Sequence, residues 1–310
     1  GIVLLLFAFV PQFGAEGVWV SVFTAISAFC NAGFDLFGRF GAYSSLVPYV
    51  NNYYVQAVVM FMIMAGGLGF MVWVELAEYR KKRRVSLHAK VVLQFSVIFW
   101  VGGAVLLALL EWSNPRTMGG LSVPGKIMAA LFQSVSTRTA GMNTIDLAAC
   151  SPISKLLMSV LQFIGAAPGS TGGGVKVTTF AVLILTIRSV AQGRDDCVIG
   201  GHHIESKTVY RALTIIVIGA VAAFGSAVVV YYNTAETVSV IDCIFESCSA
   251  FGTVGLSVGV TGQLNTGAKL LYMACMFMGR VGPVSLAISL TAKPDDNKRK
   301  VLPVGHINVG

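Results

Sequence analysis

The chain has 310 residues, of which 55% are hydrophobic and 12% are charged, and its mean hydropathy is +0.76. Soluble domains carry roughly 25% charged residues, so this composition excludes most water-soluble enzymes and predicts an integral membrane protein. The formal net charge is +8. The basic residues cluster at the ends of apolar runs, which favours a role in membrane topology over a nucleic-acid partner.

Apolar runs of about 20 residues, the length that crosses a hydrocarbon core of about 30 Å, lie at positions 55–74, 91–110, 212–230 and 270–290. A longer run at 153–187 divides into two half-length pieces. The first run, 2–10, is too short to cross and has no basic flank of a signal peptide. We therefore expect four complete spans, one interrupted span and an N-terminus cut inside a helix.

Basic clusters mark the same point in three successive units of the chain. They lie at 80–84, at Arg188 with Arg194, and at 298–300. By the positive-inside rule all three clusters are cytoplasmic, so an even number of crossings separates neighbouring clusters. The predicted units are 1–84, 85–194 and 195–292, followed by a cytoplasmic tail, 293–310.

A short segment recurs midway through each unit. The stretches SAFCNAGF, SVSTRTAGM and SAFGTVGL align on Gly33, Gly141 and Gly255, which are 108 and 114 residues apart. Each copy is an apolar helix that runs into a glycine segment, and repetition of this kind indicates the architecture. A helix that enters and leaves by one face, followed by a glycine strand, predicts a re-entrant pore loop. Small residues that pack ordinary transmembrane helices are the alternative, and they explain three equivalent copies less well.

The glycine segments have the chemistry of a cation pathway. Non-helical backbone at membrane depth is tolerated only where protein buries it or where it lines a water-filled cavity. Glycine lets successive carbonyls turn towards one axis because it has no Cβ to oppose a positive φ, and such carbonyls can replace the hydration shell of a cation. Asn31, Thr139 and Thr253 each add a side-chain oxygen next to these carbonyls.

The interrupted span contains the stretch APGSTGGGVKVTTF, residues 167–180. Gly169 and Gly174 have the spacing of a phosphate-binding P-loop, but Val175 stands where its lysine belongs. Pro168 and the glycines make a continuous helix unfavourable. A membrane-bound nucleotide hydrolase, which also needs a magnesium-binding acid, is therefore a poor alternative. We expect a broken helix here and no enzyme activity.

Two cations lie inside apolar segments: Lys176 in the helix break and Arg280 within 270–290. An arginine at the centre of a span costs at least about 2.5 kcal/mol on insertion scales, so it is a functional-site hypothesis by default. Both residues belong to elements that descend from a pore loop towards a basic cluster. Positive charge below the loops would block a cation. The alternative is that both cations are structural ties to carboxylates or helix-end carbonyls.

Five motifs that together cover almost the whole chain carry a family resemblance: SAFCNAGFDLFG, STRTAGMNTID, PGSTGGGVKVTTF, SAFGTVGLSVGVTG and MFMGRVGPVSLAISL. With them the chain resembles the Trk/Ktr/HKT superfamily of potassium transporters, and most closely the Ktr pore subunits (KtrB). The resemblance implies an all-α integral membrane protein of four M1-P-M2 units (helix, pore loop, helix) around a central pore, as in a potassium channel. Three units are present here, so we interpret them as the second, third and fourth repeats, the second with a truncated M1 helix.

The resemblance also implies two sets of site residues. The ion selectivity filter, which would bind K⁺, comprises Asn31, Ala32, Gly33, Phe34, Thr139, Ala140, Gly141, Met142, Thr253, Val254, Gly255 and Leu256. The gate comprises Gly169, Ser170, Thr171, Gly172, Gly173, Gly174, Lys176 and Arg280. No copy matches the TVGYG filter of potassium channels, so we expect a real but imperfect preference for potassium over sodium.

The function that the resemblance implies is potassium uptake across the bacterial inner (plasma) membrane, through a channel-like pore with an intramembrane gating loop. No cofactor is expected, K⁺ is the transported ion and Na⁺ is a candidate activator. The implied partners are a second copy of the chain, membrane lipid and a cytosolic KtrA-like ring of nucleotide-binding regulatory subunits; no nucleic acid is expected. An alternating-access secondary cation transporter is the alternative, but it predicts inverted repeats, whereas these repeats are parallel.

Overall fold

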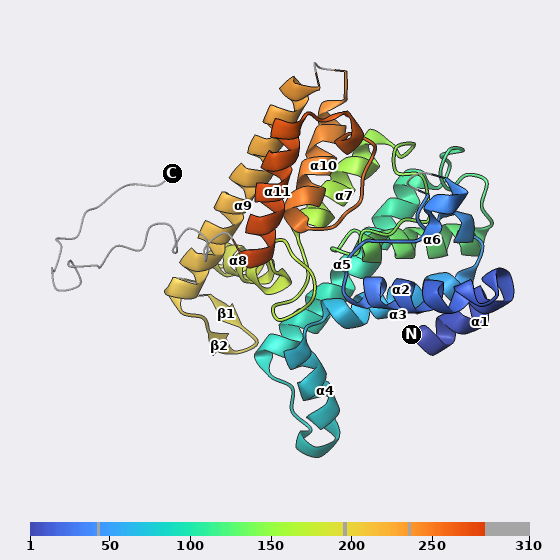
Figure 1. The fold of residues 1–310 in the computed structure, drawn as a ribbon. Coiled ribbons are helices and arrows are strands. Elements are labelled where there is room, and N and C mark those ends of the chain that lie inside the picture. Colours follow the sequence, from blue (N-terminus) through green and yellow to red (C-terminus); the bar gives the residue numbers. More distant parts are fainter. Residues whose placement is uncertain (42–43, 195–196, 235–236, 283–310) are drawn as a thin grey trace.

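The computed structural model describes residues 1–41, 44–194, 197–234 and 237–282, which form a bundle of helices with a short two-stranded hairpin (Figure 1). The helices are α1 (Ile2–Phe13), α2 (Glu16–Phe29), α3 (Tyr53–Gly67), α4 (Phe70–Lys82), α5 (Leu87–Glu111), α6 (Val123–Ser136), α7 (Pro152–Phe163), α8 (Val177–Ala191), α9 (Ser206–Asn233), α10 (Val240–Gly252) and α11 (Thr266–Val281). The 3-10 turns Phe37–Phe40, Val47–Tyr49 and Thr261–Gln263 lie in the connections, and the antiparallel strands β1 (Val198–Ile199) and β2 (His202–His203) make the hairpin.

The same arrangement of elements occurs three times. The short helices α2, α6 and α10, called re-entrant helices below, each run into a glycine loop that leads to the next helix of the unit. Each re-entrant helix packs against the helix before it: α2 against α1, α6 against α5 and α10 against α9. In addition α6 packs against α3, and α10 against α7, of the preceding unit. The re-entrant helices therefore interlock neighbouring units.

A polar cap begins each helix that follows a glycine loop. Asn52, Ser151 and Asn265 precede α3, α7 and α11, and their side chains accept a hydrogen bond from the backbone N–H three residues later, at 3.1, 3.2 and 2.9 Å. Such a cap satisfies one of the N–H groups that a helix start leaves unpaired, and it is typically worth about 1 kcal/mol. Each glycine loop thus ends at a defined residue.

The span predictions had mixed outcomes. The runs 91–110 and 212–230 lie within α5 and α9, the two unbroken helices of the described part that are long and apolar enough to cross a membrane. The run 153–187 is divided as predicted, into α7 and α8, with residues 164–176 between them. We call residues 164–176 the break loop.

The prediction of one continuous span at 55–74 is wrong. The chain bends by 97° between α3 and α4, where Gly69 has a φ of 85° that favours glycine. Phe70, the first residue of α4, donates its backbone N–H to the carbonyl of Gly169 in the break loop at 3.1 Å. The bend is therefore held by a contact to a distant segment, and α4 projects away from the bundle (Figure 1).

The prediction for 270–290 also needs correction. Helix α11 ends at Val281, and the next residue, Gly282, has a φ of 98°. Arg280 therefore lies in the last turn of the described helix and not at its middle. The remainder of this run, like the basic cluster at 298–300, lies outside the described residues.

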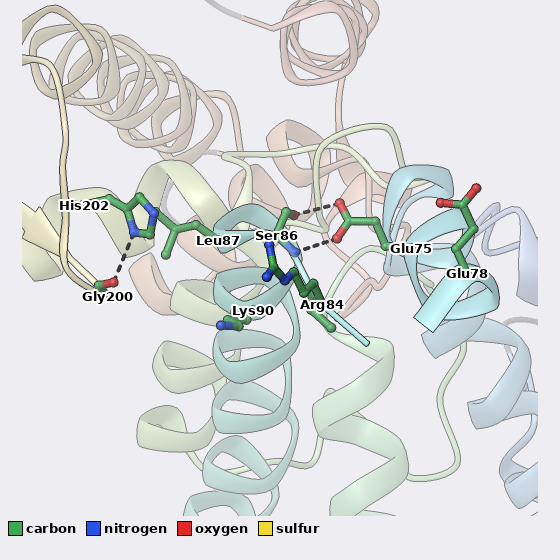
Figure 2. A pocket seen from close by; sticks show the side chains of 9 residues that line it. Glu75, Glu78, Arg84, Ser86, Leu87, Lys90, Gly200 and His202 are labelled. Atoms are coloured by element: carbon green, nitrogen blue, oxygen red, sulfur yellow. Dashed lines mark hydrogen bonds between the residues drawn. The ribbon is translucent and has the colours of Figure 1, made fainter. Parts of the chain in front are cut away.

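A cleft of about 550 Å³ opens where α4, the start of α5 and the hairpin meet (Figure 2). Ser86 joins the two helices, because its backbone N–H and its hydroxyl donate to the carboxylate of Glu75 at 2.9 and 2.7 Å. Arg84, Lys90 and His202 also line the cleft. The predicted cytoplasmic cluster at 80–84 lies at this end of the bundle.

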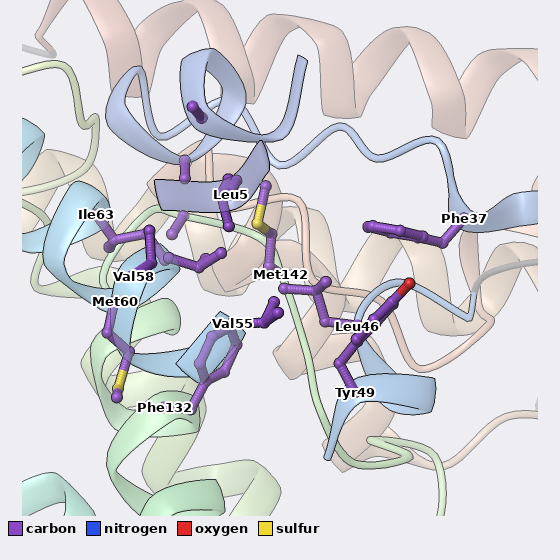
Figure 3. Packing of buried hydrophobic residues seen from close by; sticks show 14 of the residues in the cluster. Leu5, Phe37, Leu46, Tyr49, Val55, Val58, Met60, Ile63, Phe132 and Met142 are labelled. Carbon is purple, nitrogen blue, oxygen red and sulfur yellow. The ribbon is translucent and has the colours of Figure 1, made fainter. Parts of the chain in front are cut away.

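A buried apolar cluster holds the end of the Gly141 loop (Figure 3). Met142, the residue after the glycine, is fully buried in it, together with Leu5 of α1 and Phe132 of α6. Phe37 and Tyr49, from the connection after the Gly33 loop, pack in the same cluster with ring centroids 5.2 Å apart and ring planes inclined by 58°. Close van der Waals packing of these large side chains stabilises the arrangement, so the cluster anchors two of the loops together.

Candidate functional site

The three glycine loops share one backbone conformation. In each, a polar residue with positive φ is followed two positions later by a glycine with positive φ: Asn31 (50°) and Gly33 (73°), Thr139 (76°) and Gly141 (79°), Thr253 (51°) and Gly255 (93°). Only a few per cent of residues other than glycine adopt a positive φ. Three occurrences at equivalent positions therefore indicate that the repeats are structural as well as sequential.

The three glycines meet around one point. A Cβ placed on Gly33 would lie 3.1 Å from the carbonyl oxygen of Val254, 3.2 Å from that of Ala140 and 3.2 Å from the Cα of Gly141. One placed on Gly255 would lie 3.7 Å from the Cα of Gly141 and 3.9 Å from that of Gly33. Backbone carbonyls from separate loops thus converge where no side chain occupies the space.

The neighbours of the glycines support this convergence. The hydroxyl of Ser27 accepts from the N–H of Phe34 at 3.1 Å and donates to its carbonyl at 2.6 Å. Ser136 makes the same pair of contacts to Met142. Each serine belongs to a re-entrant helix, so two of the three loops are fastened back to the helix that leads into them.

The Gly255 loop is fastened by a carboxylate instead. Glu246 of α10 accepts hydrogen bonds from the hydroxyl of Ser257 at 2.6 Å and from the N–H and hydroxyl of Thr261 at 2.9 and 3.0 Å. Asp242, one turn earlier, forms an ion pair of 2.7 Å with Lys155 of α7. These two acids therefore brace α10.

The break loop lies directly against the polar residues that precede the glycines. Asn31 Nδ2 donates to Thr171 Oγ1 at 2.8 Å. A Cβ on Gly172 would collide with Thr139 Oγ1, and one on Gly173 would collide with Thr253 Oγ1. Three consecutive residues of the break loop thus each contact one member of the ring formed by Asn31, Thr139 and Thr253, which we call the oxygen ring.

Backbone hydrogen bonds fix the break loop to both neighbouring units. The N–H groups of Ala167 and Thr171 donate to the carbonyls of Gly67 and Gly66 in α3, at 3.0 and 3.2 Å. The N–H of Gly174 donates to the carbonyl of Gly279 in α11 at 3.1 Å. These three donors are therefore occupied by protein carbonyls.

Lys176 and Arg280, the two predicted buried cations, both bind carbonyls of the break loop. Lys176 Nζ donates to the carbonyl of Gly172 at 2.6 Å, and Arg280 donates to the carbonyl of Thr171. Lys176 is half-buried and Arg280 is exposed. Neither forms an ion pair with a carboxylate among the described residues, so of the alternatives considered, ties to carbonyls are the ones observed.

The other predicted residues have simpler surroundings. Phe34 is exposed, whereas Met142 and Leu256, at the equivalent positions, are buried in apolar clusters. Asp35 and Asp146, which follow two of the glycines, each accept a hydrogen bond from a backbone N–H two residues later, at 2.8 and 2.9 Å. These two aspartates therefore stabilise local turns.

Arg138 is a buried residue that the sequence reasoning did not single out. It precedes Thr139 of the oxygen ring and is only 4% exposed. The sequence does contain a signal for Arg138, because it is a charged residue inside a segment predicted to be a membrane-embedded loop. The same criterion identified Lys176 and Arg280.

Comparison with known proteins gives a consistent family. The model of the TrkH family, described as a cation transport protein, matches residues 2–300. The chain is 37% identical to the potassium/sodium uptake protein NtpJ of Enterococcus hirae, covering 94% of this chain and 64% of that protein. It is 34% identical to the Ktr system potassium uptake protein B of Bacillus subtilis, covering 97% of this chain and 66% of that protein.

A solved structure has the same fold. The potassium transporter TrkH from Vibrio parahaemolyticus matches with a TM-score of 0.71 at 19% identity, over 93% of this chain and 62% of that one. The chain thus spans a little under two thirds of the length of the relatives that it matches. The repeated re-entrant helices, the convergent glycines and the match over residues 2–300 lead to one conclusion: the chain belongs to the TrkH family of cation transport proteins.

Proposed function

We propose that this chain forms part of a channel-like pore for potassium uptake across the bacterial plasma membrane. The observation that carries the proposal is the convergence of Gly33, Gly141 and Gly255, with the carbonyls of Ala140 and Val254 beside them. Carbonyls held in this way can replace the water around a K⁺ ion. The three proposed units are residues 1–84, 85–194 and 195–292, and the backbone of the predicted filter segments at 31–34, 139–142 and 253–256 would line the pathway that they enclose.

The oxygen ring supports a cation as the transported species. Asn31 Oδ1, Thr139 Oγ1 and Thr253 Oγ1 are buried, and among the described residues none of the three atoms has a hydrogen-bond partner. A buried polar oxygen without a partner costs free energy, and a cation that passes through the ring can supply the missing interaction. K⁺ is the transported ion, Na⁺ is a candidate activator, and the chain needs no cofactor.

The break loop is the proposed gate, and its position against the oxygen ring would correspond to the closed state. Residues 171–173 lie against the oxygen ring, and at Gly172 and Gly173 there is no space for a Cβ. Lys176 and Arg280 hold the carbonyls of this segment and bring positive charge to the same place. A cation would meet both a steric and an electrostatic barrier, since like charges repel strongly where water is excluded. Potassium passes when the loop leaves the ring.

Regulation would come from the cytoplasmic side. The names of two relatives describe a Ktr system, and we propose that a KtrA-like ring of nucleotide-binding subunits docks on this protein, which acts as a homodimer in the lipid bilayer. The cleft between α4, α5 and the hairpin, with Arg84 and Lys90 on its walls (Figure 2), is the proposed contact surface.

The test is rubidium uptake by cells that lack their own potassium uptake systems. The full-length protein is expressed as wild type and as Gly141→Ser, and sodium is added as competitor. A Cβ at Gly141 would collide with the carbonyl of Val254, so the variant should lose its preference for rubidium over sodium. Gly102→Ser is the matched control, because a Cβ on Gly102 of α5 meets nothing within 4 Å.

Two outcomes would contradict the proposal. One is a wild-type protein that reaches the membrane but gives no potassium-dependent growth and no rubidium uptake. The other is a Gly141→Ser protein whose selectivity equals that of Gly102→Ser. Saturable uptake that depends on a second, co-transported ion would instead favour the alternating-access mechanism.

A further inference from the structure

The guanidinium of Arg138 is enclosed on two sides. Its central carbon lies 5.4 Å from the ring centroid of Phe99 and 5.7 Å from that of Trp100, both on α5. Cations favour the faces of aromatic rings because of the ring quadrupole. Within the described ranges no Asp or Glu pairs with this arginine. Arg138 is thus a buried cation whose charge is balanced by rings and carbonyls alone.

The hydrogen bonds of Arg138 reach the start of the break loop. Its Nη2 donates to the carbonyl of Gly165 at 3.0 Å, and its Nη1 makes a longer contact of 3.4 Å with the carbonyl of Ser96 in α5. Gly165 lies just after α7, at the start of the break loop. Its N–H donates to the carbonyl of Val175 at 2.8 Å, and this bond joins the two ends of the loop, which we call its neck. The arginine therefore holds the neck.

The backbone of Arg138 leads directly into the oxygen ring. The next residue is Thr139, whose side chain contacts the break loop at Gly172. Residues 138 and 139 together touch the break loop at its neck and at its tip. A movement of the neck would thus reach the Gly141 loop through the peptide unit that joins Arg138 to Thr139. The rings of Phe99 and Trp100 on α5 hold the guanidinium in one place.

We propose that Arg138 is a positioning residue that couples the place of the break loop to the geometry of the Gly141 loop, so that it sets ion selectivity as well as gating. The inference rests on the proposed function of the glycine loops. A planar guanidinium stacked on rings and bonded to two carbonyls fixes direction as well as charge. Without the guanidinium of Arg138, the neck and the Gly141 loop would move independently. The backbone carbonyls of the glycine loops would then adapt to an ion of different size.

The experiment uses the full-length protein with three changes at this position. Arg138→Met removes the positive charge and keeps most of the side-chain volume. Arg138→Gln keeps a hydrogen-bond donor without the charge. Arg138→Lys keeps the charge but lacks the planar guanidinium that can donate to two carbonyls. Rubidium uptake and its inhibition by sodium are measured and divided by the amount of protein in the membrane. The preference for rubidium should fall by about tenfold in Arg138→Met, within the range for residues that couple two sites. Arg138→Gln should follow it, and Arg138→Lys should recover only part.

The chain offers a matched control at the other end of α6. Lys126 Nζ lies 5.0 Å from the ring centroid of Trp112 and donates to the carbonyl of that residue at 2.7 Å. Lys126→Met removes a cation with the same kind of contacts, also between α6 and α5, but far from the glycine loops. Its selectivity should equal that of the wild type.

The outcomes separate the coupling from mere stability and from the proposed function. Unchanged selectivity in an Arg138→Met protein that folds and transports overturns the coupling, and so does full recovery in Arg138→Lys, which would make charge the only requirement. If Arg138→Met does not accumulate in the membrane, Phe99→Leu is tested in its place, because it removes one aromatic ring and keeps the arginine. An unchanged preference for rubidium over sodium in Phe99→Leu also overturns the inference. A wild type that does not take up rubidium overturns the proposed function instead.

Discussion

The side-chain amide of Asn31 donates a hydrogen bond of 2.8 Å to Thr171 Oγ1, and so joins the polar residue of one glycine loop to the tip of the break loop. The same hydroxyl donates to the carbonyl of Phe29 at 3.1 Å, and the backbone N–H of Thr171 donates to Gly66. Thr171 therefore ties the break loop to both α2 and α3.

Replacement of this threonine should open the proposed gate. Thr171→Val keeps the shape but removes both hydroxyl contacts, each worth about 1 kcal/mol, so the closed state should lose about 2 kcal/mol and flux should rise by up to about thirtyfold. Rubidium influx per unit of membrane protein measures the effect. Thr186→Val is the control, because the Thr186 hydroxyl bonds only within α8, to the carbonyl of Val182. Equal fluxes in the two variants would show that Thr171 does not hold the gate closed.

The glycines at the tip of the break loop should not tolerate a methyl group in the closed position. Gly172→Ala would place Cβ against Thr139 Oγ1 and 2.6 Å from the Cβ of Ala166. Overpacking of this kind costs about 1–3 kcal/mol, so the loop should leave the ring and flux should rise about tenfold. Gly225→Ala on α9, where a Cβ meets nothing within 4 Å, should leave it unchanged. A folded Gly172→Ala protein with wild-type or lower flux argues that the loop does not move aside.

Removal of the positive charge of Arg280 should also increase flux. Arg280→Ala removes both the bond to the carbonyl of Thr171 and a charge that repels cations. Arg280→Lys keeps the charge, so its potassium flux should stay close to that of the wild type if electrostatic repulsion is the main barrier. Arg211→Ala, at an exposed arginine of α9, controls for loss of charge alone. Potassium flux in Arg280→Ala at or below the wild-type level would exclude a barrier role.

The ion pair between Lys155 and Asp242 should contribute to stability and not to transport. Its side chains are 10% and 22% exposed and join α7 to α10. Lys155→Met leaves the carboxylate without its partner and should destabilise the protein by about 2 kcal/mol, between the values for exposed and buried pairs. The midpoint of thermal unfolding in detergent measures this. The double variant Lys155→Met with Asp242→Leu should recover most of the loss; a double variant as unstable as the single one would mean that packing, not charge, is responsible.

The glycine loops and the break loop could be predicted because their signals are local. Three copies of one motif identified the loops, and Pro168 with its neighbouring glycines identified the break. The bend at Gly69 was missed because hydropathy counts apolar residues and carries no information on backbone direction. That bend depends on the bond from Phe70 to Gly169, which joins segments far apart in the chain. The end of α11 at Val281 was also missed, because hydropathy does not show that Gly282 turns the backbone.

The particular carbonyls that bind Lys176, Arg280 and Arg138 could not be predicted from the sequence. A lysine or arginine in an apolar segment predicts a partner, but the partner depends on which loop folds beneath it. Lys176 and Arg280 bind carbonyls of the break loop, and Arg138 binds the carbonyl of Gly165. Backbone carbonyls have no signature in the sequence, whereas carboxylate partners would have had one.

The break loop is fastened to α3 by two backbone bonds and to α11 by one. The loop is short and its ends are joined by the bond between Gly165 and Val175, so we propose that these anchors break together when the loop moves. Such a transition would be cooperative even though each bond alone is weak. Single-channel records of the full-length protein should accordingly show abrupt steps between two conductance levels, and a signal from one neighbouring unit should be enough to trigger them.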